Sequence, residues 1–343
     1  MNVGWKRTAG LFIVLKKIKI KDMYQIINKK KIWFGISIAL VTASLIAFFA
    51  WGLKLGIDFT GGSLLEVKFS QQAPSVNEVQ TALSDLDLGG LTVQPTDQNG
   101  IIFRFQNTAE DMHQAVMTKL RQLAGGEQTA NQLKVDGDVT VELQATPETG
   151  ANQVEELRYE SVGPSIGQEL KRNAIYSIII ILIAIVIYVA WAFRKVSRPV
   201  ASWKYGMAGV IALFHDVIIV SGIFCFLGKF YNIEVNTPFV AALLTVFGYS
   251  IADTIVVFDR VRENLPKSHQ GFEETINTSI NQTLRRSINT SMTTMLTLLA
   301  IVLLGGDSIK YFALALLIGI FFGTYSSIFL ASPLLTLFEA KKR

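Results

Sequence analysis

Two acidic side chains lie within long apolar runs of this sequence, and an arginine lies beside a third run. Asp216 lies near the middle of the run 205–227, and Asp253 lies inside the run 239–258. Arg286 directly precedes the run 288–304. Because an ionisable group costs several kcal/mol inside a membrane, such residues are candidates for functional sites.

The chemistry that these residues could perform is proton transfer. Where charge is expensive, a carboxyl group can take up a proton from one side of a membrane and release it to the other. An arginine that approaches and withdraws would change the balance between the two forms. Ser250 shares a helix face with Asp253 at the spacing i, i+3. The polar residues predicted to support this chemistry are Ser250, Thr254, His215 and Thr290.

A structural role is the alternative for each of these residues. Asp216 and Asp253 could be interhelical clamps, and His215 could serve only to orient its neighbour. Arg286 could be retained at a membrane boundary simply because basic residues favour the cytoplasmic side. The residue pattern alone leaves both interpretations open.

The elements that must position these residues are membrane-spanning helices. The chain has 343 residues, of which 50% are hydrophobic and 17% are charged, and its mean hydropathy is +0.38. The apolar residues gather in runs of about 20, the length that a helix needs to cross a bilayer. The six predicted spans cover 32–53, 174–193, 205–227, 239–258, 288–304 and 309–330, the last continuing towards 338.

The charges predict which side of the membrane each segment occupies. Residues 55–172 contain 17 Asp and Glu against 8 Lys and Arg, whereas the rest of the chain contains 10 against 24. Six spans place both termini on one side, and the basic clusters then all lie there, as cytoplasmic segments should. We therefore expect a basic cytoplasmic N-terminus (1–31), a first span (32–54), an exported domain (55–172), five further spans (173–338) and a basic cytoplasmic tail (339–343). The bases flank apolar runs instead of forming one patch, which argues against nucleic-acid binding.

The acidic segment 55–172 is predicted to be a folded α+β domain. Alternation of apolar and polar residues predicts strands at 63–69, 91–93, 101–105, 139–143 and 156–162. Helical spacing predicts helices at 75–86, with Ser75 and Glu78 as a capping box, and at 108–123. The order β-α-β-β-α-β indicates a small ferredoxin-like sandwich.

Several other chemistries have no support in the sequence. Cys225 is the single cysteine, and the three histidines are too scattered to predict a metal site. The sequence lacks a P-loop, an HExxH motif and a GxSxG motif. We therefore expect a protein that is not an enzyme and has no cofactor.

Four segments together resemble the SecF family of the resistance–nodulation–division superfamily. Two of them, GIDFTGG (56–62) and SVGPSIG (161–167), resemble motifs that SecD and SecF share at their exported domains. GYSIADTIVVFDRVREN (248–264) is similar to the fourth-span motif of SecF and is the most specific match. Gln282 to Arg286 also fits the family pattern, and the resemblance extends from the first span to the sixth.

The resemblance implies a function in protein export. It implies proton coupling, location in the inner membrane, and partnership with SecD, the SecYEG channel, a small YajC-like subunit and the exported polypeptide. It matches Asp253 and Arg286 to the family's proton-pathway residues and extends less directly to Asp216. Two other functions stay open: a translocon scaffold that conducts no protons, and half of a small-molecule or lipid exporter of the same superfamily.

Overall fold

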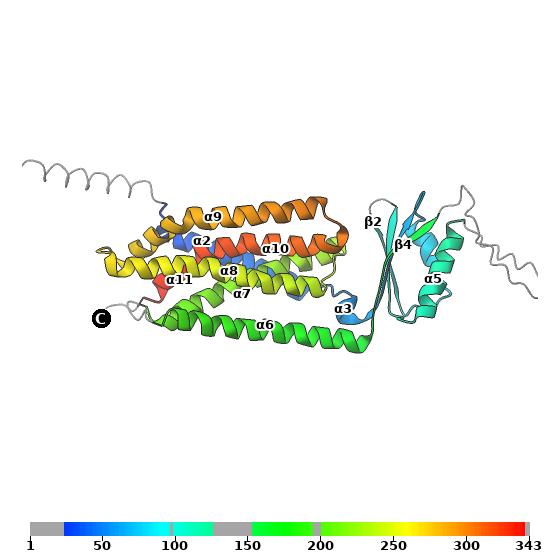
Figure 1. Cartoon of the computed structure of the whole chain (residues 1–343), viewed down its shortest axis with the longest axis horizontal. Coiled ribbons are helices and arrows are strands. Elements are labelled where there is room, and N and C mark those ends of the chain that lie inside the picture. The colour runs from blue at the N-terminus through cyan, green and yellow to red at the C-terminus, as the bar shows by residue number, and fades with distance from the viewer. Residues whose placement is uncertain (1–23, 97–98, 126–152, 195–199, 340–343) are drawn as a thin grey trace, which may run out of the picture. The chain divides into compact units, whose positions relative to one another are not determined.

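A computed structural model describes residues 24–96, 99–125, 153–194 and 200–339 (Figure 1). The chain divides into two compact units, a helical unit within 1–54 and 174–343 and an α/β unit within 55–173. The predicted strand at 139–143 lies outside the described residues.

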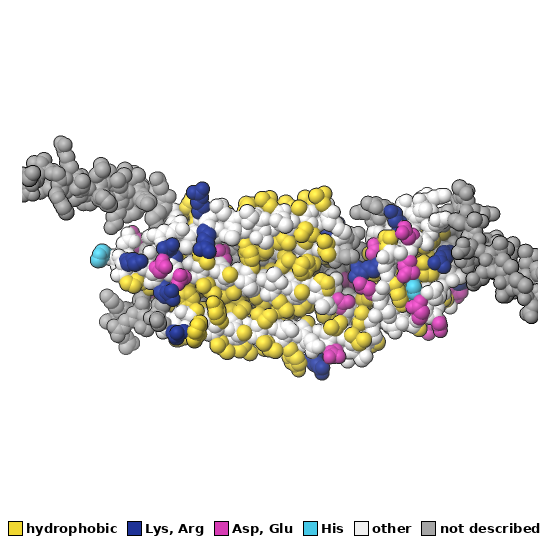
Figure 2. Space-filling model, viewed as in Figure 1, with side chains coloured by type: hydrophobic (Ala, Val, Ile, Leu, Met, Phe, Trp, Pro, Cys, Tyr) yellow, Lys and Arg dark blue, Asp and Glu magenta, His cyan; other side chains and the backbone are white. Residues whose placement is uncertain are grey.

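Within the described residues, six helices are long and apolar enough to cross a membrane, as predicted. The helical unit contains η1 (Ile27–Lys29), α2 (Lys30–Trp51), most of α6 (Pro164–Ala192), α7 (Ser202–Tyr231), α8 (Thr237–Asn264), η2 (Leu265–Lys267), α9 (Phe272–Leu304), α10 (Asp307–Ser326), the π-helical turn η3 (Ser327–Ala331) and α11 (Ser332–Leu337). Hydrophobic side chains cover much of this unit in Figure 2, and charged side chains gather at one end of it.

Local sequence explains where the helices of this unit begin and end. Asn236 caps α8 by accepting a hydrogen bond from Phe239 N, and Pro238 occupies the first turn, where its missing N–H costs nothing. Helix α7 ends at Asn232, whose φ of 57° is left-handed, a conformation that Asn tolerates well. Asn232 thus caps the end of α7 and Asn236 caps the start of α8, on either side of a short loop.

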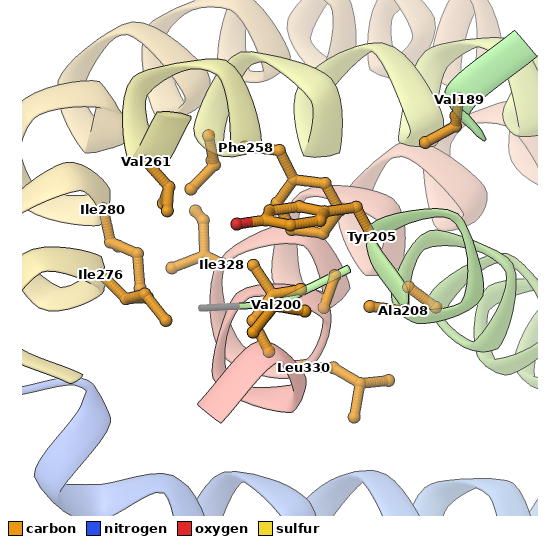
Figure 3. Packing of buried hydrophobic residues seen from close by; sticks show 14 of the residues in the cluster. Val189, Val200, Tyr205, Ala208, Phe258, Val261, Ile276, Ile280, Ile328 and Leu330 are labelled. Carbon is orange, nitrogen blue, oxygen red and sulfur yellow. The ribbon is translucent and has the colours of Figure 1, made fainter. Parts of the chain in front are cut away.

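The largest buried side chain of the helical unit is Tyr205, on α7. Its ring stacks on Phe193 and meets Phe258 of α8 edge to face, each at 5.4 Å between ring centroids. Figure 3 shows Tyr205 and Phe258 among aliphatic side chains that include Ile276 of α9 and Ile328 of η3. This cluster holds α7, α8, α9 and the π turn together at one end of the bundle.

Small residues allow the helices to approach closely. A Cβ atom at Gly319 of α10 would lie 2.2 Å from Cγ2 of Val246 on α8, and one at Gly323 would lie 3.0 Å from Cβ of Ser250. The two glycines have small-xxx-small spacing, and they bring the backbone of α10 against Ser250 of α8.

The α/β unit has the predicted ferredoxin-like fold. Its elements are α3 (Ile57–Thr60), β1 (Gly62–Phe69), α4 (Val76–Ala82), β2 (Leu91–Thr96), β3 (Gly100–Phe105), α5 (Glu110–Leu123) and β4 (Val154–Val162). The antiparallel sheet has the order β2-β3-β1-β4. Alternate residues of β1, namely Leu65, Val67 and Phe69, are buried in a core shared with α4 and α5. The capping box predicted for α4 is present.

The two glycine-containing motifs of this unit pack against each other. Gly61 has a φ of 75°, and a Cβ atom there would lie 2.9 Å from Cα of Pro164. A Cβ atom at Gly167 would lie 3.0 Å from the backbone nitrogen of Gly61. The segments 56–62 and 161–167, far apart in sequence, thus form one backbone contact that only glycine permits.

Candidate functional site

The carboxyl group of Asp216 is fully enclosed, since the residue has an exposed fraction of 0%. Its Oδ2 accepts hydrogen bonds from Ser250 Oγ (2.7 Å) and Ser326 Oγ (2.8 Å). Its Oδ1 lies 2.9 Å from Nδ1 of His215. Both carboxyl oxygens are therefore occupied, as a buried polar group requires.

The Asp216 cluster joins three helices. Asp216 and His215 belong to α7, Ser250 belongs to α8, and Ser326 is the last residue of α10 before the π turn. His215 is itself buried, and its ring stacks on Tyr325 of α10 at 6.0 Å. Three of the residues predicted from sequence are thus brought together here.

Asp253 of α8 has a different environment. Its Oδ1 accepts a 2.5 Å hydrogen bond from Ser287 Oγ of α9. Its Oδ2 is buried and has no hydrogen-bond partner among the described residues. Although Ser250 and Asp253 lie one turn apart, Ser250 binds Asp216 and Asp253 binds α9, so the two carboxyl groups have separate contacts.

Arg286 immediately precedes Ser287 but makes no ion pair with a carboxylate of the described residues. Its side chain is exposed, and its backbone oxygen accepts a hydrogen bond from the hydroxyl of Thr290. Thr290 is also exposed, and its hydroxyl donates to this backbone oxygen instead of to Asp253. The structure therefore places Arg286 close enough to Asp253 for its positive charge to act on the carboxyl group, but not within ion-pair distance of it.

Hydroxyl pairs extend the polar contacts between the helices. Thr254 Oγ1 of α8 lies 2.8 Å from Ser327 Oγ, and Ser291 Oγ of α9 lies 2.6 Å from Thr324 Oγ1 of α10. Thr254 was predicted from the sequence, but the other hydroxyl-bearing residues in these contacts were not. The missed residues all carry a hydroxyl group and lie within an apolar run or directly before one, a shared property that could have marked them: Ser287, Ser291, Thr324, Ser326 and Ser327.

The π turn at Ser327–Ala331 was also not predicted. A π turn widens the helix by one residue and leaves backbone carbonyls with altered partners, and such turns are frequent at functional sites. Ser327 Oγ donates to the carbonyl of Gly323 (2.8 Å), and Ser332 Oγ donates to the carbonyl of Ser327 (2.8 Å). The turn directly follows Ser326, so it begins where the Asp216 cluster ends.

The hydrogen bonds of Asp253 and Asp216 suit the two carboxyl groups to different roles. A carboxyl group with one unoccupied oxygen, as at Asp253, can gain a proton without losing an existing hydrogen bond. A carboxyl group with three partners, as at Asp216, can hold helices together. Among the described residues, no group of His, Cys, Asp and Glu side chains could hold a metal ion.

Comparison with known proteins identifies the family. A family model described as "Protein export membrane protein SecD/SecF, C-terminal" matches residues 142–341, which include Asp216, Asp253 and Arg286. A second model, the SecD/SecF GG motif, matches residues 46–73.

Two similar curated proteins carry the name protein translocase subunit SecF. The protein from Thermobaculum terrenum is 40% identical over 93% of this chain and 95% of its own length. The protein from Anaerolinea thermophila is 38% identical over 93% and 95%, respectively.

A solved structure is also similar, that of SecDF, a translocon-associated membrane protein from Thermus thermophilus. It superimposes with a TM-score of 0.71 at 32% identity and covers 92% of this chain but 38% of the SecDF chain. The matching motifs, the six spans and the identity over nearly the whole length agree, and the chain therefore belongs to the SecF family of protein translocase subunits.

Proposed function

We propose that the protein works with a separate SecD chain in the inner membrane and uses the proton-motive force to assist polypeptide export through the SecYEG channel. Family membership supports the translocase role. The SecD/SecF family model and the likeness to a solved SecDF structure support SecD as the partner. The proposal includes a small YajC-like subunit as a further partner and contains no enzymatic step.

Asp253 is the proposed proton-binding group. Ser287 holds one of its oxygens, and the other is buried without a partner among the described residues. A proton that reaches this second oxygen removes a charge that is costly in the apolar bundle and breaks no existing hydrogen bond. The unoccupied oxygen of Asp253 is the observation that carries the proposal.

Arg286 is the proposed cation that responds to the charge of Asp253. Its long side chain is exposed and adjoins Ser287, which already contacts Asp253. Such a stem lets the guanidinium approach an ionised carboxylate and withdraw from a neutral one, because the attraction depends on both charges. Proton binding would thereby alter the contact between α8 and α9.

The proposed output is movement of the α/β unit, which would lie outside the cytoplasm. The covalent links to this unit are the segment after α2 and helix α6, so a shift of the spanning helices would reach it through them. The acidic charge of residues 55–172 and the basic flanks of the helices support this orientation, with both termini cytoplasmic.

A passive scaffold is the second candidate function. The observation in its favour is Asp216, whose three partners from three helices are those of an interhelical clamp. A scaffold would need no protonatable group at Asp253, and this difference makes the two candidates separable.

Replacement of Asp253 by Asn tests the proposal. The amide oxygen can still accept the hydrogen bond from Ser287, but the side chain cannot take up a proton at the pH of the cell. We expect D253N to assemble with SecD and to lose the part of export that depends on the proton gradient. The measurement is the rate of export of a secreted reporter, with and without the gradient, in cells that lack their own SecF.

Asp259 provides the matched control on the same helix. Its Oδ1 pairs with Nη2 of Arg262 at 2.6 Å, and its side chain is about half exposed, at 44%. We expect D259N to export at the wild-type rate, because exposed ion pairs contribute little. Normal gradient-dependent export by D253N would contradict the proton-coupling proposal and support the scaffold.

A further inference from the structure

Asp216 has contacts that a proton carrier does not need. Every carboxyl oxygen position has a partner: Ser250 and Ser326 donate to Oδ2, and His215 lies against Oδ1. The cluster is buried on all sides. Unlike Asp253, this carboxyl group leaves no oxygen open to an arriving proton.

The two serine donors connect Asp216 to the parts of the bundle around Asp253. Ser250 precedes Asp253 by three residues on α8, which is just under one helical turn. Ser326 ends α10 immediately before the π turn, whose first residue, Ser327, contacts Thr254 of α8. Thr254 is the residue after Asp253, so the Asp216 cluster and the π turn contact α8 on both sides of Asp253 in sequence.

Close packing makes the rotation of α8 sensitive to this contact. A Cβ atom at Gly323 of α10 would press on Ser250, because it would lie 3.0 Å from Ser250 Cβ. Ser250 is therefore held between the backbone of α10 on one side and the Asp216 carboxyl on the other. If α8 rotated about its axis, Ser250 would leave Asp216 and Asp253 would leave Ser287 of α9.

We propose that Asp216 is a positioning residue for Asp253: its two oxygens fix the rotation of α8 through Ser250 and Ser326, and its own proton uptake is not a step of the cycle. This inference rests on the proposed function, because it assigns a role relative to proton binding at Asp253. It requires the acceptor geometry of Asp216 and does not require its charge.

Asparagine can reproduce that geometry. Its amide oxygen fits the Oδ2 position and can accept from Ser250 and Ser326 as the carboxylate does. Its NH₂ group then faces Nδ1 of His215, which accepts once the imidazole proton resides on Nε2. Nε2 of His215 has no partner among the described residues, so this change of tautomer breaks no hydrogen bond there. Alanine keeps none of these contacts.

The test compares D216N, D216A and D253N in membranes that contain the full chain with SecD and the channel. The readouts are the gradient-dependent export rate per assembled complex and its dependence on pH. We expect D216N to keep the wild-type rate and pH midpoint. We expect D216A to lose at least about tenfold in rate, the factor that corresponds to losing hydrogen bonds to a buried acceptor, and to show a shifted midpoint because Asp253 is displaced.

A second variant keeps the test independent of folding. S326A removes one donor and leaves the carboxyl group in place, and we expect a smaller shift of the pH midpoint in the same direction as in D216A. Loss of export in D216N as complete as in D253N would overturn the positioning role and make Asp216 a proton carrier. An unchanged rate and midpoint in D216A and S326A would also overturn it.

The failure of the wider proposal would look different. If D253N itself exports normally with the gradient present, proton coupling at Asp253 fails whatever the Asp216 variants do. If D253N is inactive and D216N is inactive too, the coupling proposal stands and only the positioning role fails.

Discussion

At the scale of single residues, the two buried carboxyl groups differ in how their oxygens are used. Asp216 has partners at both oxygens, whereas Asp253 has a donor at one and none at the other among the described residues. A buried polar atom without a partner raises the free energy of the folded state by about 1–3 kcal/mol. Protonation of the unpartnered oxygen would lower this cost, and the proposed proton is therefore placed at Asp253.

Replacement of Gly319 should lower the stability of the protein. An alanine Cβ atom there would lie 2.2 Å from Cγ2 of Val246, which is a steric clash between two nonbonded carbon atoms. We expect G319A to destabilise the protein by about 1–3 kcal/mol, the usual penalty of overpacking. Thermal unfolding of the purified protein in detergent measures the change.

Gly248 on α8 is the control for this substitution, because a Cβ atom there would meet nothing within 4 Å. G248A should be neutral or slightly stabilising, since alanine favours the helix over glycine. Equal melting temperatures for G319A and G248A would show that the contact between α8 and α10 is looser than described.

At the scale of elements, the sequence predicted which helices exist better than it predicted where they begin and end. The span predicted to begin at Ile288 belongs to helix α9, which begins at Phe272. The earlier start was missed because the first turns of α9 are amphipathic instead of uniformly apolar. Phe272, Ile276 and Ile280 are buried at a spacing of four residues while their neighbours are polar. A search for apolar runs cannot find such turns, but helical periodicity could have found them.

The α4 capping box shows how an element of the α/β unit depends on pH. The backbone N–H of Ser75 and then its hydroxyl donate to Glu78, and these bonds hold the pKa of the Glu78 carboxyl below its ordinary 4.5. Because the folded pKa is the lower one, the stabilisation is present above about pH 4.5 and is lost as the pH falls through the folded pKa. We expect E78Q to remove this dependence, measured as hydrogen-exchange protection of α4 amides in the intact protein.

Glu155 provides the control on β4, where it is exposed and has no side-chain hydrogen bond to the described residues. E155Q should leave the protection of α4 unchanged across the pH series. If wild type and E78Q lost α4 protection in parallel on acidification, the capping box would not be the source of the dependence.

At the scale of the whole molecule, composition and charge were enough to predict two kinds of unit. Apolar length predicts spans and alternation predicts strands, because both signals are local. The proton-pathway candidates Asp216 and Asp253 and the supporting residue His215 were visible as polar residues in apolar runs. The pairing of Ser250 with Asp216 and of Ser287 with Asp253 was not predictable, because it depends on how three helices, α7, α8 and α9, pack.

The proposed orientation can be tested with cysteine labelling, since Cys225 is the single cysteine and is buried. We expect T92C, in the α/β unit, to react with a membrane-impermeant maleimide in intact spheroplasts. K267C, between α8 and α9, should react only after the membrane is permeabilised, because basic loops stay in the cytoplasm. The reverse labelling pattern would invert the proposed topology.

The contact between Gly61 and the segment that contains Pro164 and Gly167 has a consequence for exchanging parts between relatives. The two glycine motifs lie at opposite ends of the α/β unit in sequence, yet each shapes the space that the other's backbone occupies. A chimera that takes its first motif from one parent and its second from another would join surfaces that were never fitted together. Both ends of the insert should therefore come from the same donor, even when only its middle is of interest.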